Sequence, residues 1–136
     1  MKKLMIVLYL LSSLTVFGQD TSNTNTYIQL SSVYYSTPGH VNVSLGQRQM
    51  IWDQGRYLTF INSVSKIVLK AYSSSHEYKS FGGDKLLTKR INNIKNILIK
   101  DCGIDSTRFI IMLIGDKMKT NNNPIGNQRV DIEITN

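Results

Sequence analysis

The sequence is poor in the residues that most chemical sites require. It holds one cysteine and two histidines in 136 residues, so an internal disulfide is excluded. His40 and His76 lie far apart and lack the spacing of a metal site. No nucleophile–base pair, catalytic carboxylate pair or phosphate loop is recognisable, and Cys102 is interpreted as a small, half-buried hydrophobic residue. The sequence therefore predicts a protein that is not an enzyme and holds no metal or cofactor.

Long apolar runs are also absent. The run at residues 4–11 follows Lys2 and Lys3 and falls short of the roughly 20 residues that a membrane-spanning helix needs. This pattern predicts a secretory signal peptide over residues 1–18, with cleavage near Gln19 and a membrane anchor as the alternative. No cysteine lies at the cleavage point, so a lipid anchor is not expected. We expect an exported protein with no transmembrane segment in its mature chain.

Acidic residues are few, 9 against 16 Lys and Arg, which gives a formal charge of +7. Lys2 and Lys3 fall in the predicted signal peptide, and removing these two charges leaves +5. A surplus of this size, spread along the chain, suits anionic surroundings but does not indicate a nucleic-acid partner. The rest of the chain is long enough for one domain with its own core.

The hydrophobic pattern predicts an α+β domain, one sheet with two helices on one side. Strands are predicted at residues 41–45, 65–72, 108–114 and 130–134, with an edge strand left open at 27–35. One helix is predicted within 51–61, where Leu58 and Ile61 follow the cap Asp53 at helical spacing. A second helix is predicted at 87–98, where Leu87, Ile91, Ile94 and Leu98 form one apolar stripe, and Gly103 is expected to end this helix. Residues 73–83 and 117–126 are predicted loops. Continuous apolar character places 65–72 and 108–114 inside the sheet, whereas alternation gives 130–134 one wet face.

Three segments carry motifs that occur together in a known family. The segments are residues 86–94 (LLTKRINNI), 102–108 (CGIDSTR) and 127–134 (NQRVDIEI). They are similar to a Leu-Ser-x-x-Arg-Ala-x-x-Val helix start, a Gly-Ile-x-x-x-Arg turn and a closing Asn-Arg-Arg-Val-Glu-Ile. In their order and separations the chain resembles the OmpA-like domain, the periplasmic peptidoglycan-binding module of outer-membrane proteins, lipoproteins and flagellar stators.

The resemblance covers residues 41–136 and leaves 19–40 as a polar tether with an additional strand left open. It implies a two-layer sandwich in which a mixed sheet carries helices on one face, in the order β-α-β-α-β-β. It also implies a periplasmic protein, with or without association to the outer membrane.

The resemblance further implies a ligand site around Arg90. In the family, a helix-start Arg and an Asp after the second strand grip the carboxylate and the ammonium at the free end of diaminopimelate in the peptidoglycan stem peptide. Arg90 matches the arginine, whereas Ser73 and Ser74 follow the strand and Ser74 stands at the Asp position. A neutral partner should weaken binding by about tenfold. Arg129 completes the candidate ligand-binding set, with support of the sheet edge as its alternative role.

Two functions stay open at this point. The first is weak, non-catalytic binding of the peptidoglycan stem peptide, as a cell-wall tether or a subunit of an envelope complex. The alternative is a degenerate OmpA-like domain that serves as a protein–protein interaction module without peptidoglycan binding. Glu77 and Asp84 lie near the same loop and are open as replacements for the missing charge, while Arg90 has the alternative of an ordinary solvated helix residue.

Overall fold

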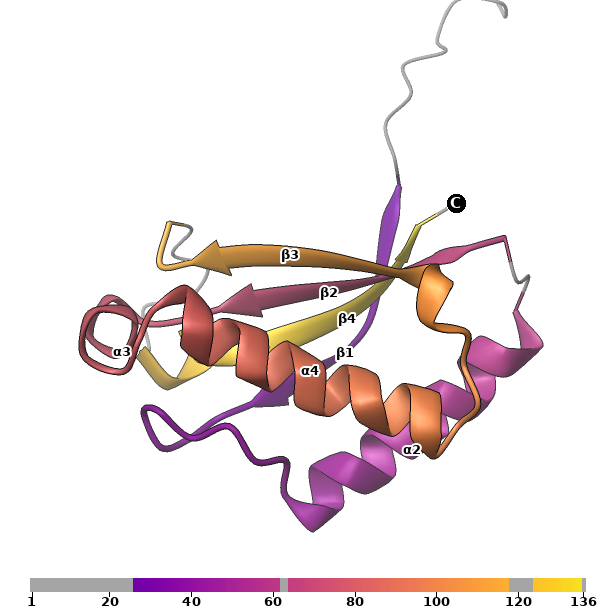
Figure 1. Ribbon diagram of the computed structural model, residues 1–136, viewed down its shortest axis with the longest axis horizontal. Coiled ribbons are helices and arrows are strands. Elements are labelled where there is room, and N and C mark those ends of the chain that lie inside the picture. The colour runs from indigo at the N-terminus through magenta and orange to yellow at the C-terminus, as the bar shows by residue number, and fades with distance from the viewer. Residues whose placement is uncertain (1–25, 62–63, 118–123, 136) are drawn as a thin grey trace, which may run out of the picture.

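The computed structural model describes residues 26–61, 64–117 and 124–135. The predicted signal peptide and residues 19–25 of the predicted tether lie outside these residues. Four strands form one sheet in the order β1-β4-β2-β3, and helices α2 and α4 lie on one of its faces (Figure 1). The strands are β1 (Tyr27–Tyr34), β2 (Lys66–Tyr72), β3 (Phe109–Gly115) and β4 (Arg129–Thr135). The helices are α2 (Leu45–Phe60), α3 (Ser75–Ser80) and α4 (Asp84–Lys100), with short 3-10 turns η1 (Ser106–Arg108) and η2 (Pro124–Asn127).

The predicted α+β class and mixed sheet are confirmed. β3 runs parallel to β2, whereas β4 is antiparallel to both β1 and β2. The predicted alternation of strands and helices holds, but its first strand is β1 and not residues 41–45. Residues 73–83 are not a loop, because α3 forms within them. Within the described residues, no helix combines the length and the apolar character needed to cross a membrane.

The apolar stripe of α4 is confirmed and forms the centre of the core. Its members, each no more than 1% exposed, are Leu87, Ile91, Ile94 and Leu98. They pack against the helix-facing residues of the sheet, among them Ile67, Leu69 and Ile132. Burial of each such side chain contributes about 1.5–3 kcal/mol. Gly103 has φ 71° just beyond the helix, a left-handed conformation that suits its predicted helix-ending role.

Two strands occupy positions other than those predicted. The central position of β2 is confirmed, since it lies between β4 and β3. The interior position predicted for 108–114 is wrong, because β3 is an edge strand. The wet face predicted for 130–134 is wrong too, because β4 lies between β1 and β2 with all of its residues buried.

The charged residues of β4 are buried because they are paired. Glu133 forms an ion pair of 2.6 Å with Lys70 on β2, and Asp131 forms one of 2.9 Å with Arg129. These side chains alternate with the core residues of β4 and so lie on the sheet face away from the helices. The alternation of polar and apolar residues in β4 therefore reflects two buried faces, an apolar one towards the helices and one of paired charges on the other side of the sheet.

The N-terminal elements also differ from the prediction. No strand forms at 41–45, and the first strand is β1, the edge strand that the sequence left open. Helix α2 begins before the predicted residue 51, because Ser44 caps it in a capping box with Gln47. Val43 packs against the core from the preceding loop, which accounts for the alternation.

Candidate functional site

Arg90 is completely buried in an ion pair with Glu77 of α3. Its Nη1 and Nη2 donate to Glu77 Oε1 and Oε2 at 2.7 and 2.6 Å, and its Nε donates to the carbonyl of His40 at 2.8 Å. Both side chains of the pair are 0% exposed. The planar guanidinium holds the carboxylate with two parallel hydrogen bonds, the strongest arrangement for this pair of groups. The alternative of a solvated helix arginine is thereby excluded.

The segment between β1 and α2 covers the pair. The Tyr35 ring centroid lies 4.0 Å from Arg90 Cζ, a cation–π contact, and Gly39 N–H donates to Glu77 Oε2 at 3.0 Å. Gly39 has φ 78°, and a Cβ there would overlap the Phe81 ring. Glycine is thus the residue that lets this backbone N–H reach the carboxylate.

Tyr35 brings a buried hydroxyl to the same place. The side chain is 2% exposed, and its Oη has no hydrogen-bond partner among the described residues. Burial raises the pKa of Tyr35 well above its usual 10.0, and the nearby Arg90 guanidinium only partly offsets that shift. The phenol therefore stays neutral throughout the physiological range.

Ser74 positions Glu77. It is the N-cap of α3, and its Oγ accepts the Glu77 N–H at 3.2 Å and donates to Gln128 Oε1 at 3.2 Å. Gln128 in turn donates to the Tyr35 carbonyl at 2.8 Å, which ties the closing segment of the chain to the same cluster. Ser73 is buried beside it, and its Oγ has no partner among the described residues.

Arg129 lies apart from this cluster. It alternates along β4 with the core residues, so it faces away from the helices. Its Nε donates to Asp131 Oδ1 at 2.9 Å, and its guanidinium carbon lies 4.1 Å from the Tyr72 ring centroid. The structure therefore groups Arg90 and Ser74 around Glu77, with Ser73 adjacent, and places Arg129 among sheet-supporting contacts.

Of the two carboxylates that the sequence left open, Glu77 contacts Arg90. Asp84 instead accepts a hydrogen bond of 2.8 Å from the Tyr78 hydroxyl. The sequence did not connect Tyr35, Gly39 or Gln128 with Arg90 and Glu77. For Gln128 a signal existed, since it belongs to the closing motif that carried the family resemblance.

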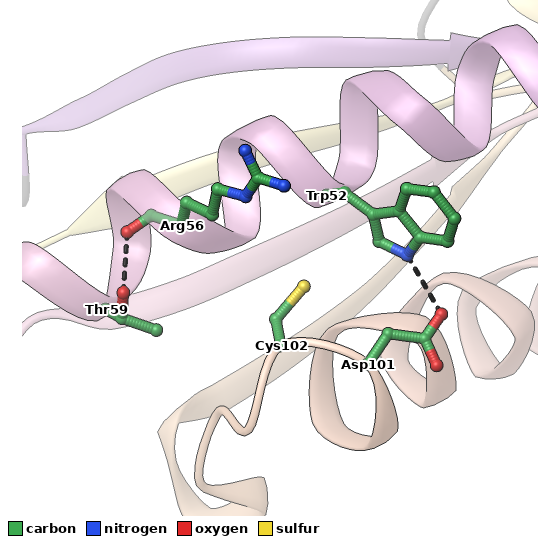
Figure 2. Close-up of a pocket in the computed structure, with 5 residues that line it drawn as sticks. All are labelled: Trp52, Arg56, Thr59, Asp101 and Cys102. Carbon is green, nitrogen blue, oxygen red and sulfur yellow. Dashed lines mark hydrogen bonds between the residues drawn. The ribbon is translucent and has the colours of Figure 1, made fainter.

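A hollow lies apart from this cluster, between α2 and the end of α4 (Figure 2). It has a volume of about 340 Å³ and is lined by Trp52, Arg56, Thr59, Asp101 and Cys102. Burial raises the pKa of the Cys102 thiol, so the thiolate is disfavoured at neutral pH, as the structural interpretation of this cysteine expects. No group of three or more His, Cys, Asp or Glu residues in the described part of the chain is arranged to hold a metal.

Neither a protein-family model nor a curated protein matches the sequence. Solved structures do match. The C-terminal domain of Helicobacter pylori MotB aligns with a TM-score of 0.67 at 12% identity, over 79% of this chain and 85% of that chain. This chain has an OmpA-like fold.

Two further structures support that fold. The OmpA-like domain of FopA1 from Francisella tularensis subsp. tularensis SCHU S4 aligns with a TM-score of 0.62 at 15% identity, over 88% of this chain and 85% of that one. The peptidoglycan-associated lipoprotein from Burkholderia pseudomallei aligns with a TM-score of 0.64 at 16% identity, over 77% and 90%. At such identities the likeness establishes the OmpA-like fold but not the ligand.

Proposed function

We propose that this protein is a non-catalytic domain of the bacterial cell envelope that binds the stem peptide of peptidoglycan weakly. The observation that carries the proposal is that the Arg90 guanidinium binds a carboxylate, that of Glu77, through two parallel hydrogen bonds. The name of one structural neighbour, a peptidoglycan-associated lipoprotein, supports the class of ligand. In this proposal the chain is exported to the periplasm and serves as a tether or as a subunit of an envelope complex.

The internal ion pair is the closed form of the proposed site. On opening, the carboxylate at the free end of diaminopimelate takes the place of Glu77 on Arg90. Glu77 then faces the ammonium of the same ligand end and supplies the negative charge that Ser74 lacks. Ser74 keeps Glu77 in position as the cap of α3, and the unpartnered Ser73 hydroxyl is a further acceptor for the ammonium. Arg129 supports the sheet in this mechanism.

Opening makes the binding weak. Separating a buried ion pair costs about 3–5 kcal/mol, which the new charge-assisted bonds to the ligand recover in part. Without that recovery the cost would lower the affinity by about two to four orders of magnitude relative to a site that is already open.

The complete burial of the pair favours a second function. If Arg90 and Glu77 never separate, the pair only fixes the segment after β1 onto α3 and α4, through Gly39 and His40. The domain is then an interaction module for other envelope proteins and has no peptidoglycan ligand.

Co-sedimentation with purified peptidoglycan sacculi separates the two functions. We expect the wild type to be retained and the double variant Glu77→Leu/Arg90→Met to remain in the supernatant. The double variant removes both charges together, so it keeps the packing without leaving a buried charge unpaired. Lys89→Ala, which removes the exposed neighbouring cation on α4, is the matched control and should be retained like the wild type.

Calorimetry with a soluble stem peptide adds the chemical detail. Binding should disappear when the free-end carboxylate of diaminopimelate is amidated, because Arg90 then has no anion to hold. If the wild type is not retained by sacculi, the peptidoglycan proposal is wrong and the interaction module stands. If the double variant is retained as well as the wild type, the ligand does not bind on Arg90 and the proposed site is wrong.

A further inference from the structure

The segment between β1 and α2 covers the Arg90–Glu77 pair. It comprises residues 36–43, forms neither helix nor strand, and is here named the strap (Figure 1). The Gly39 N–H donates to Glu77 Oε2 at 3.0 Å, and the His40 carbonyl accepts from Arg90 Nε at 2.8 Å. Both charged side chains are 0% exposed with the strap in place. A ligand therefore reaches Arg90 only when the strap moves away.

The strap is otherwise held loosely. Within the described residues, one further hydrogen bond joins it to the rest of the domain, from Asn93 Nδ2 to the Val41 carbonyl at 2.8 Å. Its single backbone–backbone hydrogen bond in that part of the chain is internal to it. None of its residues is buried, and two hollows of about 450 and 310 Å³ adjoin it at Asn42 and Val43. Segments with few buried contacts and no backbone pairing open locally without global unfolding.

The two ends of the strap are fixed. At its start, Tyr35 N–H donates to the Gln128 carbonyl at 2.8 Å, and Gln128 Nε2 donates back to the Tyr35 carbonyl at 2.8 Å. At its end, Ser44 caps α2. A loosely held segment between two fixed ends moves about those ends as hinges. The strap can therefore open as one unit while β1 and α2 stay in place.

The strap presents the same chemical groups to the pair as the proposed ligand does. Gly39 offers a donor to the Glu77 carboxylate, and His40 offers an acceptor to the Arg90 guanidinium. The free end of diaminopimelate would offer an ammonium donor to Glu77 and a carboxylate acceptor to Arg90. Hydrogen bonds between ionised groups are stronger than those of neutral backbone groups, so the ligand is able to replace the strap.

We propose that the strap is autoinhibitory: when closed it occupies the place of the ligand's charged end, and it opens as one unit to admit that end. The identity of the ligand rests on the proposed function, whereas the opening is a property of the fold alone. The apparent affinity is then the intrinsic affinity multiplied by the fraction of molecules with an open strap. A change that loosens the strap should therefore tighten ligand binding.

Hydrogen exchange of the free protein, followed by NMR, tests the opening. The Gly39 amide should be protected at least tenfold less than the amide of Ile94, which lies in the buried stripe of α4 and exchanges on global unfolding. Equal protection of the two amides would overturn the proposal, because the strap would then open only when the whole domain unfolds.

Asn93→Ala tests the inhibition. Its bond to Val41 exists only while the strap is closed, so its loss should raise the open fraction about two- to tenfold. Calorimetry with a soluble stem peptide that has a free diaminopimelate end should show a Kd lower by the same factor. Exchange of the Gly39 amide should speed up to match. Asn92→Ala, at an exposed residue of the same type on α4, is the matched control and should change neither quantity.

The sign of the effect separates the strap from an ordinary supporting contact. If Asn93 merely supported the site, its loss would weaken binding. A peptide affinity that is unchanged or lower in Asn93→Ala would therefore overturn the inhibitory role and leave Arg90 as the ligand site. If neither the wild type nor Asn93→Ala binds the peptide, the proposed function is wrong and the inhibitory role falls with it, even where exchange shows that the strap opens.

Discussion

Glu77 and Arg90 form a fully buried ion pair that joins α3 to α4 with hydrogen bonds of 2.7 and 2.6 Å. The pair also holds the segment after β1, because Gly39 donates to the carboxylate and His40 accepts from the guanidinium. Desolvation offsets much of the attraction in such a pair, yet the loss of one partner leaves a buried charge with no counter-ion. The pair should therefore tolerate joint replacement far better than single replacement.

The first prediction follows from this asymmetry. Arg90→Met alone should lower the free energy of unfolding by about 3–5 kcal/mol, whereas Glu77→Leu/Arg90→Met should stay within about 1–2 kcal/mol of the wild type. Urea denaturation followed by circular dichroism measures both. A loss below about 1 kcal/mol in the single variant would contradict this, because Glu77 would then have to become solvated once Arg90 is removed.

Tyr35 supplies the second prediction, on alkaline stability. Because burial raises the pKa of its phenol above the usual 10.0, the neutral form is favoured in the folded state. Its contribution to stability is complete below pH 10.0 and is lost as the pH rises above that value towards the folded pKa.

Tyr35→Phe should therefore reduce the loss of stability above pH 10.0. At pH 7 it should leave the free energy of unfolding unchanged or raise it by about 1 kcal/mol, because the hydroxyl has no partner to lose. Tyr34→Phe, at the neighbouring residue that is 48% exposed, is the control. Alkaline unfolding curves that coincide for Tyr35→Phe and the wild type would contradict the prediction.

The fold was predictable where periodicity alone decides the structure. The stripe from Leu87 to Leu98 specifies a helix with one buried face, and the continuous apolar run of β2 suits a strand covered on both sides. Composition did not reveal sheet order, because β3 is as apolar as β2 yet lies at an edge. The burial of Glu133 was equally hidden, since its partner Lys70 lies far away in the sequence.

The candidate site was predictable only in part, for a similar reason. Arg90 was predictable because it belongs to a motif whose residues all lie close together in the sequence of one helix. Its partner Glu77 depends on Ser74, which turns an expected loop into the first turn of α3. Tyr35 reaches the guanidinium from the end of β1, and no local pattern indicates a contact over such a separation.

The third prediction concerns Asp101, which accepts hydrogen bonds of 2.9 Å from both Trp52 Nε1 and Arg48 Nη2 (Figure 2 shows the first). These bonds lower the pKa of the Asp101 carboxyl below its usual 3.8. Because the folded pKa is lowered, the stability that this carboxylate contributes is present above pH 3.8 and is lost as the pH falls through the folded value.

Trp52 is the single tryptophan of the chain, so its fluorescence reports this bond. In the folded protein the fluorescence should titrate with a midpoint below pH 3.8, and Asp101→Asn should abolish that titration. The control is Asp105→Asn, which removes another carboxyl of lowered pKa, bonded to Thr107 and not to Trp52. A midpoint at or above pH 3.8 would mean that the indole does not donate to Asp101 in solution.

The last prediction compares two glycines of α2. Gly55 is buried, and a Cβ built on it would overlap Cβ and Sγ of Cys102, whereas a Cβ on Gly46 would meet nothing within 4 Å. Alanine is favoured over glycine in a helix by about 0.5–1 kcal/mol, so Gly46→Ala should stabilise the protein by up to that amount. At Gly55 the overlap should outweigh this gain, because overpacking a core costs about 1–3 kcal/mol.

Urea denaturation of the two alanine variants should therefore give changes of opposite sign. Adding Cys102→Ala to Gly55→Ala removes the sulfur and should recover part of the loss, which identifies the contact responsible. If Gly55→Ala stabilises the protein as much as Gly46→Ala, then α2 does not approach the end of α4 this closely.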